Sequence, residues 1–587
     1  MRRHLEPLLA GLAGLLLGSG LALGLVWRDL DRLGQAVLGY GQADSYGAVY
    51  LHHAFQRALL AGRWTLVDPD QLHPVGFSRV GDAGGNSLEF VLGGLFALIL
   101  DFPAWYNVAA LAWIPLNLLA FLPLGRHLWG RWGPALAAGA AWAMMPPVIG
   151  QIAAGRLTQV VLFALPLALL GLLKLSEEGG RRAAVLAGVG MGLAGLSYWF
   201  YGYFMALLAP LILLPALWRR PRRELLVEVA QAAGVCLLVI APLLLLVLSE
   251  RSRFASGSFA VSDPTSPDAL SLWGPGARHM QGWLPWVFLP GFALTLWKGH
   301  RRALWSGLVV LTLVFAMGAA QVSPAGWTWR LPYWVLWKLA PGLDRMTHPD
   351  RWVHVAGLFL TLLAADGLAR WKAWATWVLP LGVFVQLQVM SLPMGSWRPG
   401  LEPPYTQLAQ QSGGAVVVLP FLQCADAVRF QPFHGRPLVG GMVERMPEKR
   451  PPEFEAFVLG SPLLTGLFGL SQGEDVEVEL WQEDLEALQR AGVDTLLLDR
   501  QCQMRSGTAR DVALEEQVTE LLGPPQYRHD AGAVWALPTQ GGRAGAPPRA
   551  ERELTLRDIP NARKASPGAP RSPPPQPPSG AQGQPPR

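Results

Sequence analysis

Cysteine is scarce in this chain, with three residues in 587, and their spacing fits no metal-binding motif. Cys236 lies inside an apolar run, where a lone thiol is typical of packing. Cys424 and Cys502 each follow a short apolar segment that we predict to be a strand, 415–419 and 494–498. If the two strands are parallel neighbours, both thiols emerge at one sheet edge, where an oxidising exterior would permit a disulfide. Two unpaired thiols are the alternative.

Charged residues are also few. Asp, Glu, Lys and Arg make up 15% of the chain, whereas hydrophobic residues make up 51%. This balance is too apolar for an ordinary soluble protein and predicts a multi-pass membrane protein, and the 25 tryptophans fit interfacial aromatic belts. The net charge is +6, but many of the basic residues stand in short loops between apolar runs. No basic and aromatic surface motif accompanies them, so we expect no nucleic-acid partner.

The apolar runs predict about eleven membrane-spanning helices, near residues 7–26, 104–124, 135–149, 157–173, 183–197, 203–217, 225–248, 283–297, 303–320, 353–369 and 374–391. A twelfth run, 89–100, would cover only ~18 Å as a helix, against ~30 Å of hydrocarbon, so we expect it to be re-entrant or interfacial. Every short basic loop then falls on the side of Arg2 and Arg3, which the positive-inside rule makes the cytoplasm. The prediction is a bacterial inner-membrane protein with a cytoplasmic N-terminus and a periplasmic C-terminal region.

The predicted fold class is mainly α, a polytopic helical membrane protein with a small C-terminal α/β extracytoplasmic domain. We place the membrane domain at 1–394, with interfacial helices in the first outward loop at 27–87, and the periplasmic α/β domain at 395–537. Amphipathic helical segments at 483–491 and 512–522 alternate with the two predicted strands, which is typical of an α/β domain. The Pro-rich tail, 538–587, has too little apolar surface to fold, and we expect it to be disordered.

Asp44 stands out by its location, just past the first span and before a predicted helix at 45–60. On that helix Leu51 and Phe55 share an apolar face, while His52 and His53 lie on the other, as in a helix lying flat on the membrane. Asp44 would then either cap the helix N-terminus or act as a base that activates an acceptor hydroxyl or amine. We assign no metal ligands, because adjacent histidines diverge on a helix, but a divalent metal stays an open alternative.

The order of these residues resembles the GT-C superfamily of integral membrane glycosyltransferases, and especially a bacterial branch with a C-terminal outward domain. The resemblance is carried by Gly41-Gln42-Ala43-Asp44, Pro74 with Gly84-Gly85, Trp105-Tyr106-Asn107, Met145-Pro146-Pro147, Gly155-Arg156-Leu157-Thr158-Gln159, and Arg345 to Asp366-Gly367. It implies an enzyme that uses a polyprenyl-phosphate sugar, with Asp44 as catalytic base or metal ligand. Many relatives have a second acid in the next outward loop, where this chain has Arg156 and its neighbours.

The candidate substrate-binding residues are polar groups in the predicted outward loops: Arg156, Gln159, Arg345, His348, Arg351, Asp82 and His73. A guanidinium at the outer membrane edge can form paired hydrogen bonds to a lipid phosphate, although snorkelling to ordinary headgroups is the alternative. Arg345, His348 and Arg351 form a charged cluster before a span, which would bind phosphate or anchor the helix end. Asp82 and His73 lie among turn-forming residues and have turn roles as their alternative.

The favoured function is transfer of a sugar from a polyprenyl-phosphate donor to a lipid or glycan acceptor on the periplasmic side of the membrane. One alternative is a lipid-linked glycan transporter or flippase, but the spans carry few charges and no internal repeat is visible. The other is a non-catalytic envelope assembly protein, which the missing second acid keeps open. The expected partners are the lipid-linked sugar, its acceptor and the membrane.

Overall fold

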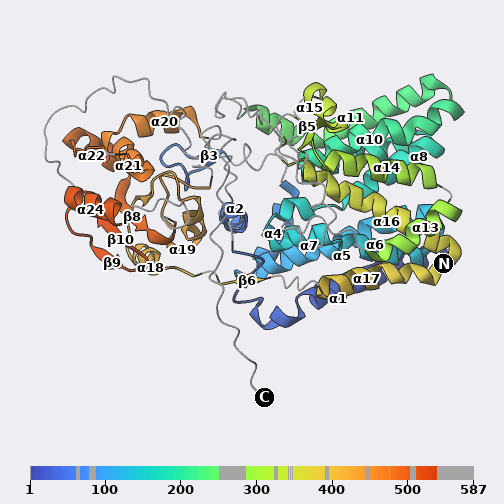
Figure 1. The fold of residues 1–587 in the computed structure, drawn as a ribbon, viewed down its shortest axis with the longest axis horizontal. Helices are drawn as coiled ribbons and strands as arrows, with labels where there is room; N and C mark the ends of the chain where they lie inside the picture. Colours follow the sequence, from blue (N-terminus) through green and yellow to red (C-terminus); the bar gives the residue numbers. More distant parts are fainter. Residues whose placement is uncertain are drawn as a thin grey trace, which may run out of the picture.

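The computed structural model describes residues 2–538, apart from 42, 61, 63–66, 79–86, 250–285, 300, 323–327, 341–342, 344–345, 347, 390–394, 399, 443–449, 475 and 503–510. It has two parts, a bundle of helices and a smaller part that contains a sheet, with helix α2 (Ala43–Leu60) between them (Figure 1).

The bundle consists of helices from across the first two thirds of the chain. Its long helices are α1 (Arg2–Leu25), α5 (Ala104–Trp129), α8 (Ala164–Glu177), α9 (Arg181–Ser197), α10 (Trp199–Arg219), α11 (Arg222–Ser249) and α16 (Trp352–Trp371). Shorter ones are α4 (Ser87–Ala97), α6 (Trp132–Ala143), α7 (Pro146–Ala153), α13 (Leu289–Lys298), α14 (Arg302–Ala316), α15 (Pro332–Leu339) and α17 (Val378–Val389). A hairpin of β4 (Ala320–Val322) and β5 (Thr328–Arg330) precedes α15.

By length and composition, fewer of the described helices are full spans than the sequence predicts, which is about eleven. Among the described residues, six helices are long and apolar enough to cross a membrane, or up to eight if each of two bent pairs is one span. Every predicted span does contain helix, but several of these helices are short. One predicted span is bent by 42° between α6 and α7, where Pro146 and Pro147 begin a new helix after Met145.

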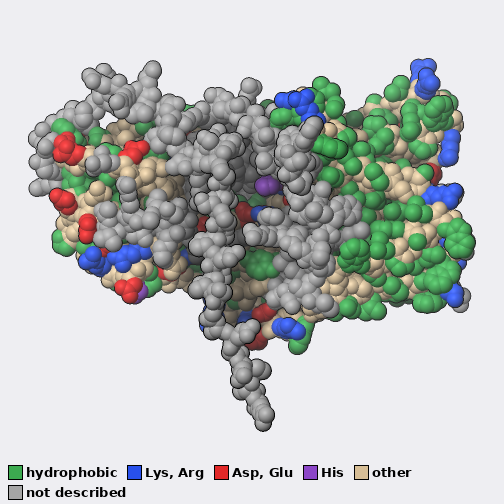
Figure 2. Space-filling model, in the orientation of Figure 1, with side chains coloured by type: hydrophobic (Ala, Val, Ile, Leu, Met, Phe, Trp, Pro, Cys, Tyr) green, Lys and Arg blue, Asp and Glu red, His purple; other side chains and the backbone are tan. Residues whose placement is uncertain are grey.

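Small residues allow the helices of the bundle to approach closely. A side chain at Gly171 would collide with the backbone of Ala187, and one at Gly190 would collide with that of Ala168. Such contacts between α8 and α9 are typical of helices that pack within lipid. Helix α11 lies at the surface of the bundle, since only 6% of its most apolar stretch is buried. Figure 2 shows hydrophobic side chains over much of the bundle surface, while Lys and Arg gather at the end far from the sheet.

The chain after α1 continues through η1 (Trp27–Arg32) and β1 (Val37–Leu38) into α2, and then through the antiparallel pair β2 (Val67–Asp68) and β3 (Phe77–Ser78). The prediction that His52 lies on a polar face of α2 is wrong, while the placement of α2 flat on the membrane stays a prediction. His52 is buried, and its ring packs on Phe90, Trp105 and Tyr106 of α4 and α5. Tyr46 and Tyr50, on another face of α2, are buried against the C-terminal part. Two partners cover this helix, which the apolar pattern of one helix cannot reveal.

The C-terminal part contains a four-stranded sheet in the order β7 (Ala415–Leu419), β8 (Val493–Asp499), β10 (Gly532–Ala536), β9 (Tyr527–His529). Strands β7 and β8 are parallel, and the other pairs are antiparallel. The helices here are α18 (Pro403–Gln410), η9 (Ala425–Arg429), α19 (Gln431–His434), α20 (Pro452–Leu459), α21 (Pro462–Gln472), α22 (Gln482–Arg490) and α24 (Asp511–Leu522). The two predicted strands and two predicted helices of this region are confirmed.

The disulfide alternative is also confirmed, since Cys424 and Cys502 are bridged. Each follows the end of one of the parallel strands β7 and β8, whose carboxyl ends meet at one sheet edge. A short pair of strands joins the two parts of the molecule. The short strand β6 (Ser396–Trp397), which follows the last bundle helix, pairs antiparallel with β1, which follows the first.

Candidate functional site

Asp44 and Arg156 form an ion pair. Nε of Arg156 donates to Oδ2 of Asp44 at 2.6 Å, and Nη2 of Arg156 forms an ion pair with the same oxygen, also at 2.6 Å. The side chains are 49% exposed for Asp44 and 36% exposed for Arg156, so both remain within reach of solvent or a ligand. Oδ1 of Asp44 accepts no hydrogen bond from the residues that the structure describes. The pair therefore combines an accessible carboxylate oxygen with a guanidinium that can be drawn away from it.

Close backbone packing holds the two residues together although they are far apart in sequence. Arg156 follows α7 and leads into η2 (Leu157–Val160), and Gly155 before it has φ +72°. A Cβ atom on Gly155 would lie 2.5 Å from Cα of Ser45, so only glycine permits the first turn of α2 to come this near. The Tyr40 amide donates to the Ala153 carbonyl at 2.6 Å, and the Ser45 hydroxyl donates to the Tyr40 carbonyl at 2.7 Å.

Arg351 supplies a second guanidinium beside this pair. It ends η7 (Pro349–Arg351), directly before α16, and its charge interacts with those of Arg156 and Asp44. Its Nη1 donates to the hydroxyl of Tyr198, and its guanidinium lies 5.2 Å from the centre of that ring. Tyr198 stands at the junction of α9 and α10. The site thus gathers one end of α2, the loop after α7, the α9–α10 junction and the start of α16.

Gln159 lies beneath the loop that carries Arg156. It is buried, and its backbone carbonyl accepts a hydrogen bond of 2.8 Å from the Tyr201 hydroxyl. Its side-chain Oε1 has no hydrogen-bond partner among the described residues. Tyr201, in α10, is itself buried and lies against His354 of α16. The Gln159–Tyr201 hydrogen bond therefore connects the loop that carries Arg156 to α10 and α16.

Of the other predicted substrate-binding residues, the structure describes His348 and His73, and neither contacts Asp44 or Arg156. His348 is exposed, with Nδ1 at 3.8 Å from the carboxylate of Asp350. His73 lies against the C-terminal part, where Nε2 is 2.6 Å from the Ala491 carbonyl. Arg345 and Asp82 lie outside the described residues. The binding roles of these four residues stay predictions.

The histidines of α2 do not join Asp44 in a metal site. Burial lowers the pKa of His52 to about 3 and that of His53 to about 4. Both imidazoles are therefore neutral at ordinary pH, and they pack on the rings of α4 and α5. Within the part of the chain that the structure describes, no three His, Cys, Asp or Glu side chains lie close enough to hold a metal ion.

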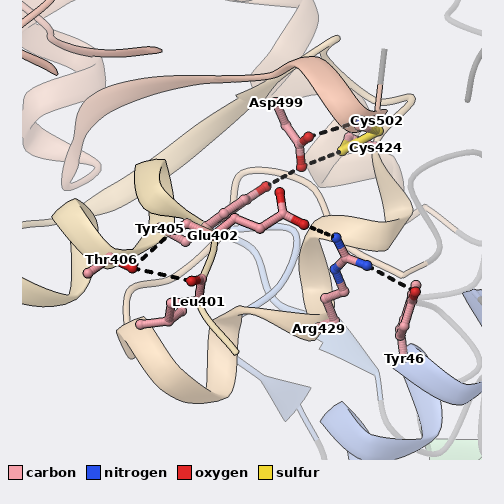
Figure 3. Close-up of polar contacts among 9 residues, drawn as sticks. All are labelled: Tyr46, Leu401, Glu402, Tyr405, Thr406, Cys424, Arg429, Asp499 and Cys502. Atoms are coloured by element: carbon pink, nitrogen blue, oxygen red, sulfur yellow. Dashed lines mark hydrogen bonds and ion pairs between the residues drawn. A yellow bond between two sulfur atoms is a disulfide. The ribbon is translucent and has the colours of Figure 1, made fainter. Parts of the chain in front are cut away.

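Trp397 and Arg429 contact Tyr46, in the turn that bears Asp44, and the sequence pattern does not predict either contact. Tyr46 packs edge-on against Trp397 of β6, with ring centres 5.1 Å apart, and its hydroxyl accepts a 2.9 Å hydrogen bond from Arg429 of η9 (Figure 3). Arg429 is separated from Tyr46 by 383 positions, and neither element has a periodicity that predicts their contact.

Comparison with known proteins gives the class first. The chain resembles membrane-embedded glycosyltransferases of the GT-C superfamily, as the sequence predicts. No family model matches it.

The particular relatives are arabinosyl transferases. Over 225 residues the chain is 31% identical to the undecaprenyl phosphate-alpha-4-amino-4-deoxy-L-arabinose arabinosyl transferase of Pseudomonas paraeruginosa, a match that covers 38% of each chain. Over 226 residues it is likewise 31% identical to the protein of that name from Pseudomonas aeruginosa, again covering 38% of each chain. The match thus spans well under half the length of these relatives.

Two solved structures have a similar chain fold. ArnT from Cupriavidus metallidurans bound to undecaprenyl phosphate has a TM-score of 0.49 and 11% identity, over 89% of this chain and 97% of that one. The arabinofuranosyltransferase AftD from Mycobacteria also has a TM-score of 0.49, with 17% identity, over 85% of this chain and 37% of that one.

Proposed function

We propose that this protein is a membrane glycosyltransferase that moves a sugar from a polyprenyl phosphate to an acceptor on the outer side of the membrane. The observation that carries the proposal is the cluster of one accessible carboxylate, Asp44, with two guanidiniums, those of Arg156 and Arg351. The partial similarity to transferases named for undecaprenyl phosphate-linked aminoarabinose supports the class of donor.

The chemistry assigns each charge a task. Asp44 accepts the proton of an acceptor hydroxyl or amine as its oxygen or nitrogen attacks the anomeric carbon of the sugar. The bond between that carbon and the phosphate oxygen breaks, and its electron pair leaves with the phosphate. The leaving lipid phosphate gains a second negative charge, which Arg156 and Arg351 stabilise through charge-assisted hydrogen bonds. Arriving phosphate competes with Asp44 for Arg156, and so frees Oδ2 of Asp44 to act as the base.

The charge distribution supports an orientation in the membrane. Lys and Arg side chains gather at the bundle end where the N-terminus lies, and the sheet lies at the opposite end (Figures 1 and 2). The positive-inside rule then assigns the N-terminus to the cytoplasm and the sheet, together with Asp44, to the periplasm. In a Cys236→Ser background, a membrane-impermeant maleimide should label Asp530→Cys in intact cells and should not label Arg181→Cys. The reverse pattern would overturn the orientation.

The function is tested with Asp44→Asn in the full-length protein in lipid nanodiscs. The assay measures release of undecaprenyl phosphate from undecaprenyl phosphate-linked sugars, with extracted membrane lipid and glycan as the acceptor pool. A side-chain amide at this position cannot accept the proton, so release should fall by at least about a hundredfold, within the usual range for a lost general base. Asp29→Asn is the matched control, because Asp29 also pairs with an arginine, Arg32, at 3.6 Å, and lies in the segment after α1. Retained release in Asp44→Asn would remove Asp44 from the mechanism.

A further inference from the structure

The turn of α2 that bears Asp44 is held from two sides. On the bundle side, Ser45 lies against Gly155. On the other side, Tyr46 is 3% exposed and forms an apolar cluster with Tyr50 and Val428. Since Asp44 and Tyr46 are in the same turn, whatever fixes the Tyr46 ring also fixes the start of the helix and the carboxylate that projects from it.

Arg429 makes the polar contact at this second side. Its Nη1 donates to the Tyr46 hydroxyl at 2.9 Å, and its guanidinium lies 4.7 Å from the centre of the Tyr46 ring and 4.3 Å from that of Phe430. Its Nη2 pairs with Glu402 at 2.5 Å, and the side chain is only 11% exposed. A largely covered guanidinium whose charge is balanced and which lies against two rings is a rigid donor.

The sheet of the C-terminal part fixes Arg429 in turn (Figure 3). Cys424 stands directly before η9, and its bridge to Cys502 ties the start of that element to the end of β8. Asp499, the last residue of β8, accepts from the Cys502 amide at 2.9 Å and from the Tyr405 hydroxyl at 2.8 Å. Tyr405 is in α18, which begins directly after Glu402. Both partners of the Arg429–Glu402 pair are therefore anchored to one strand end.

We propose that Arg429 is a positioning residue for the candidate active site. It transmits the fixed geometry of the bridged sheet edge to the first turn of α2, and so holds Asp44 opposite Arg156. On this view the C-terminal part completes the site, although it contributes no group to the chemistry. This inference rests on the proposed function for its catalytic consequence, but the structural link to α2 can be tested without it.

The test compares full-length wild type with Arg429→Ala, Arg429→Lys and Tyr46→Phe in nanodiscs. Amide hydrogen exchange is followed by mass spectrometry in peptides that cover 43–50. Arg429→Ala should raise exchange there by about tenfold or more, the scale set by one lost hydrogen bond to a charged group. Tyr46→Phe, which removes only the hydroxyl, should do the same to a smaller extent, and should add little in the Arg429→Ala background because both changes break one contact.

Transfer kinetics supply the second readout. Arg429→Ala should lower kcat by about tenfold and leave KM for the lipid donor within about twofold, because the donor's own contacts are intact. Arg429→Lys should recover part of kcat, since a lysine keeps one donor and the charge. Arg528→Ala is the matched control, an arginine of the same part that pairs with Glu515 at 2.7 Å. It should change neither exchange at 43–50 nor kcat.

Unchanged exchange at 43–50 in both Arg429→Ala and Tyr46→Phe would overturn the proposal, whatever their activity. If Arg429→Ala does not fold, Tyr46→Phe alone decides. Failure of the proposed function has a different signature, because Asp44→Asn would then retain transfer while the exchange result for Arg429 would still stand.

Discussion

Replacement of Arg156 should affect sugar transfer much more than it affects the free energy of unfolding. Its ion pair with Asp44 is short, but both side chains are more than a third exposed. Exposed pairs contribute only about 0–1 kcal/mol, because solvent screens the charges and ordering long side chains costs entropy. Arg156→Ala should therefore lower the free energy of unfolding by no more than about 1 kcal/mol.

The effect on transfer should be much larger. If Arg156 donates to the leaving phosphate, its loss removes a charge-assisted interaction of about 1.5–3 kcal/mol, or roughly ten- to hundredfold in rate. Arg156→Lys should be intermediate, because a lysine keeps the charge but not the two-pronged donor geometry. Binding of undecaprenyl phosphate to the protein in nanodiscs should weaken in the same order.

The measurements are thermal unfolding, phosphate-lipid binding and release of undecaprenyl phosphate, made on one preparation of each variant. Arg32→Ala is the control, because Arg32 is exposed and pairs with Asp29 within η1. Full transfer by Arg156→Ala would refute the phosphate role. A loss of stability of several kcal/mol with matching loss of activity would instead make the pair structural.

Three further predictions concern the surroundings of the site. Gly155→Ala should abolish transfer by pushing away the first turn of α2, whereas Gly523→Ala, at φ +81° with open space around it, should cost only about 1 kcal/mol of strain in unfolding measurements. Reduction of the Cys424–Cys502 bridge, checked by thiol alkylation, should lower both transfer and the unfolding temperature. Burial, with the nearby arginines, lowers the pKa of His434 to about 3, so the unfolded chain binds its proton first. The contribution of His434 to the free energy of unfolding is complete above pH ~6.5. It decreases as the pH falls from there to about 3, by up to ~1.4 kcal/mol per pH unit. His434→Asn should flatten that slope in urea titrations; an unchanged slope would contradict it.

Local pattern was sufficient for the class of fold. Low charge and long apolar runs follow directly from the lipid solvent. β7 is a continuous apolar segment and β8 contains the apolar run Leu496–Leu498, a pattern typical of parallel buried strands. The disulfide remained one of two alternatives, because spacing alone does not tell whether two strands are neighbours. The neighbouring placement of Cys424 and Cys502 is a fact of tertiary structure.

The partners within the site were beyond the sequence pattern. Asp44 was singled out by its place in the chain, but its contact with Arg156 spans 112 positions and depends on the close approach that Gly155 allows. His52 was expected in an open polar face and is buried, because α2 is covered by partners on more than one side. Arg429 resembles any surface arginine until its neighbours are known.

The pairing of β1 with β6 has a consequence for how this molecule can be divided. Val37 pairs with Trp397 and Leu38 pairs with Ser396, so the segment after the first helix forms a two-stranded sheet with the segment that enters the C-terminal part. Truncation after α17 would leave β1 with a bare edge and remove the tryptophan that packs on Tyr46. Separate expression of the two parts, or exchange of one part between homologues, must therefore preserve the pairing of β1 with β6.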